Sequence, residues 1–386
     1  MYLLDLSHTA HTRARTGIQR VARQLQVELT RRQSALPITW DPYAGTWRGL
    51  DDWETANLQA TQPRPGRGAK WPWSARWQGR WRRWRRTSAV LPANQGLIVP
   101  ELFSPAVAAA FDRIPHSGPR IALFHDAIAL QHPELTPPAS VGRFPAYLQE
   151  LLQFDGIAAV SEDSRQTLAD YWRWLGVAST PPVVAIPLGL TAPDRAQLAH
   201  HPSAAQAAPV VLCVGSIEGR KNHLALLEAC ERLWQQGEKF NLRLIGLAQP
   251  QTGRQALARI RQLQAAGHPL RYDGAVDEVT LEEAYASCTF TVYPSLKEGF
   301  GLPVLESVAR GKPCVCSAHG ALGESTRGGG CLPLTEVTPD ALAAAIAQLL
   351  TEPGRLGALI AEAQRRPIRT WADYTADLLA WIDTLR

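Results

Sequence analysis

Two glutamates, Glu298 and Glu306, stand on either side of a glycine-rich turn in the segment 293–313. Pro303 favours the beginning of a helix after that turn, because proline in the first helical turn loses no hydrogen bond. Amide hydrogens at the start of a helix attract anions, and phosphate above all. A phosphate cradle flanked by two carboxylates predicts a ligand that has both phosphates and hydroxyls, and a sugar nucleotide is such a ligand.

Two basic residues, Arg220 and Lys221, come just before a helix predicted for residues 223–236. The plain alternative is a pair of solvent-exposed charges. Cations are disfavoured at a helix N-terminus, however, so their position indicates that an anion binds between them. We therefore expect a diphosphate to contact Lys221 and Arg220.

His125 and Asp126 follow an apolar run, residues 121–124, that is typical of a strand. A lone histidine is more often structural, but side chains at the carboxyl end of a parallel strand emerge where ligands bind. Asp126 is expected to orient His125 or its loop. Gly17, in the first loop, has no side chain and would let the backbone approach a ligand. For Arg20, two roles remain as alternatives: a ligand contact and a charge on the helix surface.

These segments, in their order along the chain, resemble the retaining family-4 glycosyltransferases with the GT-B fold, and most of all the bacterial mannosyltransferase branch. The matching segments are Thr16–Leu25, Ala122–Glu134, Ala159–Leu168, Val211–His223 and Tyr293–Pro313. The resemblance implies two Rossmann-like domains with doubly wound parallel sheets that face each other across a cleft.

The resemblance also implies a role for each residue. Lys221 would neutralise the diphosphate and its growing charge, which is often the largest catalytic contribution. Arg220 would replace an arginine that the family often has near position 216. The residues implied as catalytic are His125, Glu298, Lys221 and Arg220. Those implied in donor binding are Gly17, Gly215, Ser216, Gly299, Phe300, Gly301, Leu302 and Glu306, with Glu306 on the ribose hydroxyls from the first turn of its helix.

Paired carboxylates also suggest a glycoside hydrolase with an acid and a nucleophile. The phosphate cradle between them argues against that function, because hydrolase substrates carry no diphosphate. The sequence has no Asp-x-Asp triplet, which metal-dependent glycosyltransferases use to hold a divalent cation. We therefore expect no metal and no cofactor, with the nucleotide sugar as co-substrate.

The chain has 386 residues, which exceeds the usual limit for a single core and favours two domains. Apolar strands alternate with helical patterns in two blocks, typical of parallel sheets covered by helices. We predict an N-terminal acceptor-binding domain over 1–190 with an Arg/Trp-rich insert at about 40–95, and a linker over 191–208. A nucleotide-sugar-binding domain would cover 209–367, and a helix over 368–386 would cross back to the first domain.

The net charge of +5 and the pI near 9.0 fit anionic partners such as nucleotides or lipid headgroups. The sequence contains no run of eighteen apolar residues, so we predict no transmembrane helix. The first ten residues lack the features of a signal peptide and are typical of a buried strand. The six cysteines are expected to be reduced and buried, and a metal site at Cys314 and Cys316 is disfavoured. These features predict a cytoplasmic protein, with a peripheral position on the inner face of the plasma membrane as the option left open.

The segment 71–86 is rich in tryptophan and arginine. Its tryptophans recur at helical spacing and form one stripe, with arginines around it. This composition is typical of a helix that lies in a membrane interface. The alternatives are a stripe packed on the domain and a site that stacks single-stranded nucleic acid. The expected membrane contacts are Trp73, Trp77, Trp81, Trp84, Arg80 and Arg83.

The sequence thus predicts a hexosyltransferase that moves a sugar, first of all mannose from GDP-mannose, to a hydroxyl of a glycan or lipid-linked glycan. Surface polysaccharide or lipopolysaccharide assembly is the expected context. Alternatives are transfer of rhamnose or glucose from dTDP- or UDP-sugars, a phosphorylase or epimerase on the same fold, and a non-catalytic protein that binds glycan or nucleic acid. The membrane surface is a possible partner, and nucleic acid is not expected.

Overall fold

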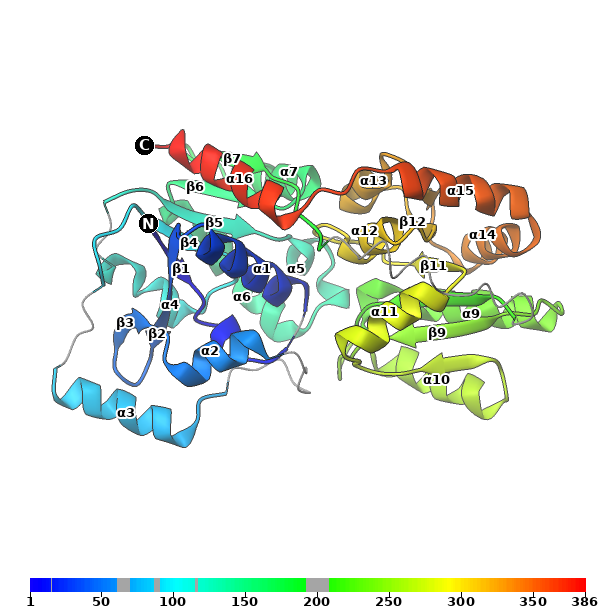
Figure 1. Ribbon diagram of the computed structural model, residues 1–386, viewed down its shortest axis with the longest axis horizontal. Helices are drawn as coiled ribbons and strands as arrows, with labels where there is room; N and C mark the ends of the chain where they lie inside the picture. The colour runs from blue at the N-terminus through cyan, green and yellow to red at the C-terminus, as the bar shows by residue number, and fades with distance from the viewer. Residues whose placement is uncertain (15, 61–69, 87–90, 115–116, 192–207) are drawn as a thin grey trace. The chain divides into compact units, whose positions relative to one another are not determined.

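The computed structural model describes residues 1–386 except 15, 61–69, 87–90, 115–116 and 192–207 (Figure 1). The chain divides into two compact units, which are described separately. Unit 1 comprises Met1–Asp126, Arg143–Gly189 and Trp371–Arg386, and unit 2 comprises Ala127–Gly142 and Leu190–Thr370. The segment 127–142, which the sequence placed in the first domain, groups with unit 2, where Leu135 lies against Gly219. Of the predicted linker, residues 192–207 lie outside the described residues.

Unit 1 is built on a seven-stranded sheet in the order β3-β2-β1-β4-β5-β6-β7. The strands are β1 (Tyr2–Asp5), β2 (Ala35–Asp41), β3 (Thr46–Gly49), β4 (Leu97–Val99), β5 (Arg120–Phe124), β6 (Gly156–Ala159) and β7 (Val183–Ala185). All neighbours pair in parallel except β2 and β3, which form an antiparallel hairpin. The sequence analysis did not identify β2 and β3, so part of the predicted insert belongs to the sheet itself.

The helices of unit 1 follow from capping and apolar periodicity. Their bounds are α1 (Gly17–Arg31), α2 (Asp52–Gln59), α3 (Trp73–Trp84), α4 (Pro105–Ala108), α6 (Pro138–Glu150, which starts in unit 2), α7 (Glu162–Trp174) and α16 (Trp371–Asp383). Thr16 and Gln19 form a capping box at the start of α1. Helix α16 buries Trp371, Tyr374 and Leu378 at helical spacing and lies beside α1.

Unit 2 contains a six-stranded sheet in the order β10-β9-β8-β11-β12-β13, with every pair parallel. The strands are β8 (Val210–Val214), β9 (Asn241–Ile245), β10 (Leu270–Tyr272), β11 (Phe290–Tyr293), β12 (Cys314–Ser317) and β13 (Cys331–Leu334). The strand order reverses between β8 and β11, and ligands of such sheets bind at the carboxyl ends of the strands at this switch point.

Helices cover the sheet of unit 2, so its central strands read as continuous apolar runs. The helices of unit 2 are α5 (Ile128–Gln131), α9 (His223–Gln235), α10 (Arg254–Ala265), α11 (Glu278–Ser287), α12 (Leu302–Ala309), α13 (Gly320–Thr326), α14 (Pro339–Thr351) and α15 (Pro353–Arg365). All six cysteines are free and buried, which agrees with the expectation from their positions in the sequence. Across the part of the chain that the structure describes, no helix combines the length and the apolar character needed to cross a bilayer.

Helix α3 lies at the outer edge of unit 1 beside the turn between β2 and β3 (Figure 1). Its buried residues are Ala75 and Gly79, the two smallest side chains in the helix. A Cβ at Gly79 would lie 2.6 Å from Cβ of Tyr43 and 2.9 Å from Oδ1 of Asp41. The tryptophan stripe is exposed, which argues against the alternative that it packs on its own domain. The helix packs through its small residues instead, because only they permit this close approach to the turn.

Replacing Gly79 by Ala is expected to destabilise unit 1, although alanine is favoured over glycine in a helix by about 1 kcal/mol. The added methyl group overpacks the contact with Tyr43, and overpacking costs about 1–3 kcal/mol. Urea titrations measure the free energy of unfolding. Gly142→Ala in α6 is the matched control, since a Cβ there meets no heavy atom within 4 Å. Equal stabilisation of both variants would contradict this packing.

Candidate active site

The loop between β8 and α9 places Lys221 at the carboxyl end of the sheet. A short 3-10 helix, Gly219–Lys221, follows the loop, and Asn222 then adopts a left-handed conformation with φ of 53° before α9 begins. The turn buries Lys221, whose Nζ lies 4.5 Å from the centroid of the Tyr293 ring. Gly215, at the end of β8, lies beside both side chains. Lys221 is therefore a buried cation at the switch point of the sheet.

The carboxylate of Glu298 accepts hydrogen bonds from several side chains. Its Oε1 accepts from the Lys221 ammonium, from the Tyr293 hydroxyl at 3.0 Å and from the Ser295 hydroxyl at 2.5 Å. Its Oε2 pairs with Arg220 at 2.7 Å. Arg220 also pairs with Glu218 at 2.9 Å. The structure thus brings together three of the residues expected to be catalytic, Glu298, Lys221 and Arg220.

The charges around Glu298 decide its protonation state. Burial alone would raise the pKa of Glu298, but the charges of Arg220 and Lys221 and its hydrogen bonds outweigh burial and lower the pKa to about 2. Burial lowers the pKa of Lys221, and Glu298 offsets part of that effect. A carboxylate held ionised at neutral pH is no proton donor, and a glycoside hydrolase needs a general acid with a raised pKa. Glu298 therefore does not fit that role.

The glycine-rich turn between Glu298 and α12 is tightly packed. Gly301 caps α12 with φ of 102°, and a Cβ there would lie 2.8 Å from Cδ2 of Leu322. The Ser325 hydroxyl donates to the carbonyl of Phe300 at 2.9 Å. Gly299 and Phe300 precede the N-cap Gly301, and Leu302 begins the helix. The first amides of a helix have no partner within the helix itself. The turn can therefore present amide donors to an anion, and its binding of a phosphate stays a prediction.

Glu306 lies in the second turn of α12, not in the first, because the helix begins at Leu302. It is buried, and the Tyr285 hydroxyl donates to its Oε2 at 3.4 Å. The Arg310 guanidinium lies 4.6 Å from the Tyr285 ring centroid. The sequence placed this carboxylate one helical turn too early, so the dipole at the helix start does not explain its position.

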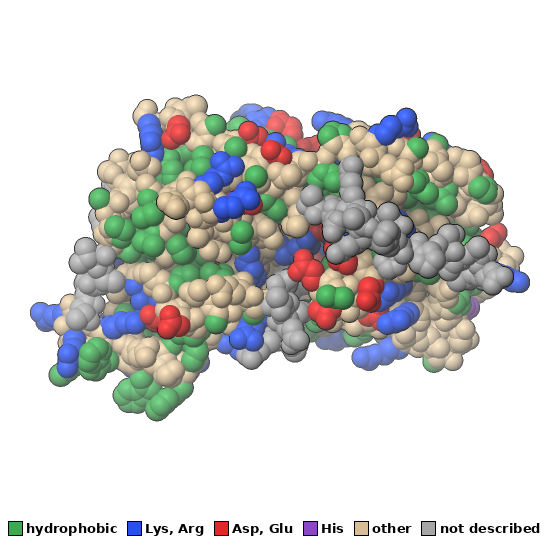
Figure 2. Space-filling model, viewed as in Figure 1, with side chains coloured by type: hydrophobic (Ala, Val, Ile, Leu, Met, Phe, Trp, Pro, Cys, Tyr) green, Lys and Arg blue, Asp and Glu red, His purple; other side chains and the backbone are tan. Residues whose placement is uncertain are grey.

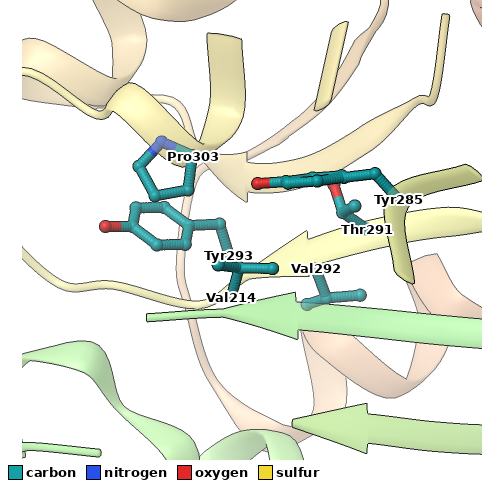
Figure 3. A pocket seen from close by; sticks show the side chains of 6 residues that line it. All are labelled: Val214, Tyr285, Thr291, Val292, Tyr293 and Pro303. Atoms are coloured by element: carbon teal, nitrogen blue, oxygen red, sulfur yellow. The ribbon is translucent and has the colours of Figure 1, made fainter. Parts of the chain in front are cut away.

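A small pocket lies at the start of α12 (Figure 3). Figure 3 shows the Tyr293 ring beside Pro303, with Tyr285 on the other side of the pocket. The lining residues are Val214, Tyr285, Thr291, Val292, Tyr293 and Pro303. Tyr293 therefore belongs both to the lining of this pocket and to the hydrogen-bonded cluster around Glu298.

His125 and Gly17 belong to unit 1. His125 follows β5 and is buried, and its Nε2 lies 2.8 Å from the carbonyl of Pro100, so Nε2 carries the proton. Burial lowers the pKa of His125, which favours the neutral imidazole with Nδ1 as the acceptor nitrogen. Gly17 begins α1 and is exposed, with no heavy atom within 4 Å of a Cβ built there. A ligand therefore has room to approach the backbone at Gly17.

Sequence reasoning missed three partners in the site: Tyr293, Ser295 and Glu218. Tyr293 is the last residue of β11, and Ser295 follows it by two positions. Both lie inside the segment that contains Glu298, so a hydroxyl at the end of a strand next to an acidic residue was an available signal. Glu218 stands two residues before Arg220. No comparable signal marks Glu218, because its pairing with Arg220 depends on the conformation of the loop.

Solved structures of similar shape identify the fold. Sucrose-phosphate synthase from Thermosynechococcus elongatus has a TM-score of 0.70, with 18% identity, over 100% of this chain and 99% of that chain. HepE from Anabaena, solved with UDP and glucose, has a TM-score of 0.69 and 15% identity over 100% of both chains. At these identities the likeness shows the fold alone, which is the GT-B fold of glycosyltransferases.

Sequence comparison supports a transferase. Residues 196–366 match the family model described as "Glycosyl transferases group 1". The serotype-specific mannosyltransferase WbdA of Escherichia coli is 27% identical over 333 residues, 81% of this chain and 38% of that protein. A D-inositol 3-phosphate glycosyltransferase of Thermobispora bispora is 32% identical over 188 residues, 46% of this chain and 43% of that protein. The chain thus spans less than half the length of these curated relatives.

Proposed function

We propose that this chain is a retaining, metal-independent hexosyltransferase that uses a nucleoside-diphosphate sugar. One observation carries the proposal: Glu298 is held ionised by Lys221 and Arg220 directly before the glycine turn that opens α12. Cations beside a helix start suit the diphosphate of a donor. The carboxylate suits the hydroxyls of its sugar.

Each residue has a proposed role. Lys221 and the amides from Gly299 to Leu302 hold the diphosphate and stabilise its charge as the sugar leaves. Arg220 orients Glu298, which contacts the donor sugar, and Glu306 accepts from the ribose hydroxyls. His125, in unit 1, offers a neutral imidazole. The leaving phosphate accepts the proton of the acceptor hydroxyl, so transfer with retention requires no separate base.

Mannose is the proposed sugar and GDP-mannose the proposed donor. The support is the printed function of relatives: the mannosyltransferase WbdA, and an O-antigen chain mannosyltransferase B of Escherichia coli that is 36% identical over 107 residues. These names also support a glycan or lipid-linked glycan as acceptor, in surface polysaccharide or lipopolysaccharide assembly. Because purine and pyrimidine are told apart by scattered contacts, UDP- and dTDP-sugars are the alternatives that the assay must include.

The test is a transfer assay with GDP-mannose, UDP-glucose and dTDP-rhamnose, with methyl α-mannoside as acceptor. The expected result is release of GDP from GDP-mannose and a mannosylated product whose anomeric configuration, read by NMR, is α. Release from another donor would reassign the sugar and leave the transferase in place. Absence of nucleoside diphosphate release with every donor, at any protein concentration, would favour a non-catalytic binding protein.

Metal independence is tested in the same assay. We expect an excess of EDTA to leave the rate unchanged within error, because Lys221, Arg220 and the start of α12 supply the positive charge that a divalent cation supplies elsewhere. Dialysis against EDTA followed by addition of Mn²⁺ or Mg²⁺ is the matched control. A rate that falls with EDTA and recovers with either ion would overturn this part of the proposal.

A further inference from the structure

Helix α3 has two faces that differ in what they contact. Ala75 and Gly79 are buried, and Arg82, three residues further on, is half-buried. The exposed tryptophans are Trp73 (75% exposed), Trp77 (54%), Trp81 (52%) and Trp84 (78%). Each is displaced by two positions from a residue of the inner face, which is about 200° around a helix. The tryptophan stripe therefore points away from unit 1.

The inner face holds α3 firmly against the unit. Arg82 donates two hydrogen bonds to Asp51, at 2.9 and 3.1 Å, and lies 3.6 Å from Asp41. Just before the helix, the ring centroid of Trp71 lies 4.2 Å from that of His11 and 5.5 Å from that of Trp53. The helix is thus fixed at both ends, and the outward direction of its tryptophans is set by the fold.

The outer face is strongly basic. Residues 73–86 contain six arginines and no acidic residue. Besides Arg82, which faces inward, these arginines are exposed: Arg76, Arg80, Arg83, Arg85 and Arg86. Figure 2 shows hydrophobic side chains and Lys or Arg side chains gathered together over this edge of unit 1. At about 150–250 Å² for each tryptophan, the stripe exposes roughly 500 Å² of aromatic surface, as large as the largest apolar patch on an ordinary monomer.

We propose that the outer face of α3 is a docking site for an anionic phospholipid bilayer, where it lies in the plane of the interface. Tryptophan prefers the boundary between headgroups and acyl chains, because its ring is apolar and its N–H is polar. The exposed arginines lie at the depth of the headgroup phosphates, which attract them. This site would keep the unit beside a membrane whatever donor the other unit binds, so the inference does not depend on the proposed function.

Two other occupants fit the observations less well. Single-stranded nucleic acid binds by stacking bases on ring faces, but Arg85 already lies 4.2 Å over the ring of Trp81 and the ring of Trp73 lies edge-on to Trp77. A second copy of the chain would bring two arginine-rich faces together, and like charges repel. An anionic bilayer complements both the charge and the aromatic stripe.

The experiment is co-sedimentation of the full chain with vesicles of phosphatidylcholine alone and of phosphatidylcholine with 30% phosphatidylglycerol. The full chain is expected to bind the anionic vesicles and to lose binding as salt rises. The triple variant Trp77→Ser, Trp81→Ser, Trp84→Ser should bind them at least tenfold more weakly. Arg80→Gln with Arg83→Gln should weaken binding to the anionic vesicles roughly 30-fold. Trp174→Ser, which removes an exposed tryptophan of α7, is the matched control and should bind as the full chain does.

Every substituted side chain is exposed, so each variant is expected to keep its fold. Unfolding curves of each variant check this. Unchanged binding of the tryptophan variant, or no binding of the full chain to anionic vesicles, would overturn the proposal. So would two other results with the same variants: loss of binding to a dT20 oligonucleotide without any vesicle binding, or loss of a dimer seen by sedimentation. Donor hydrolysis should be equal in all variants, which separates a failure of this site from a failure of the transferase.

Discussion

Lys221→Ala is expected to lower kcat for sugar transfer by about 10²–10³, the loss measured when a main electrostatic donor is removed from an active site. Lys221 is buried and contacts Glu298 and Tyr293. A cation from the solvent therefore cannot take the place of its ammonium group. The affinity for GDP should fall as well, because the ammonium group also holds the diphosphate in the ground state. Initial rates with GDP-mannose and calorimetric titration with GDP measure the two effects.

Lys239→Ala is the matched control, since Lys239 is an exposed lysine of the same unit. It should change neither quantity. Removing Lys221 also leaves Glu298 with one buried cation fewer, so the variant must be shown to unfold cooperatively before its rate is interpreted. Full activity in a folded Lys221→Ala protein would remove the role given to this residue.

Glu298→Gln is expected to have the largest effect on stability and to abolish most turnover. The folded protein lowers the pKa of Glu298 from 4.5 to about 2, and a shift of that size corresponds to about 3 kcal/mol. Because the folded-state pKa is the lower one, this stabilisation is present above pH 4.5 and is lost as the pH falls towards 2. The free energy of unfolding of the variant should thus be lower at pH 7 by about 3 kcal/mol, with Lys221 and Arg220 left without their shared carboxylate.

Urea titrations at several pH values measure this difference. The gap between the natural protein and Glu298→Gln should narrow between pH 4.5 and pH 2. Glu283→Gln, which changes an exposed glutamate of α11, should show no such gap at any pH. A gap that stays constant with pH would mean that the carboxylate is not held ionised by the two cations.

Five of the six strands in the sheet of unit 2 could be predicted from the sequence, and β13 (Cys331–Leu334) was not identified. Its strands are apolar runs bounded by glycine, proline or polar residues, as in the segment that became β8 and the one that became β11. The hairpin of β2 and β3 in unit 1 could not. β2 contains Pro37 and lies in a stretch that matched no motif, and only its pairing with β1 in space identifies it as a strand.

In the site, the residue types were predictable and their contacts were not. The spacing of Glu298, the glycine turn and Lys221 indicated an anion site, and the structure brings these residues together. The hydroxyls of Tyr293 and Ser295 that fix Glu298 were missed, because their contact depends on how the turn after β11 folds. Similarly, the tryptophan stripe was recognised in the sequence. Its exposure depends on Gly79, whose small size permits α3 to pack through its opposite face.

The most direct test of the account is a crystal structure with GDP bound. The expected result places the diphosphate within hydrogen-bonding distance, about 3 Å, of the Lys221 ammonium and of the amides that open α12. The ribose hydroxyls should contact Glu306. A nucleotide bound elsewhere, or a diphosphate that leaves the pair of Lys221 and Glu298 untouched, would contradict the account.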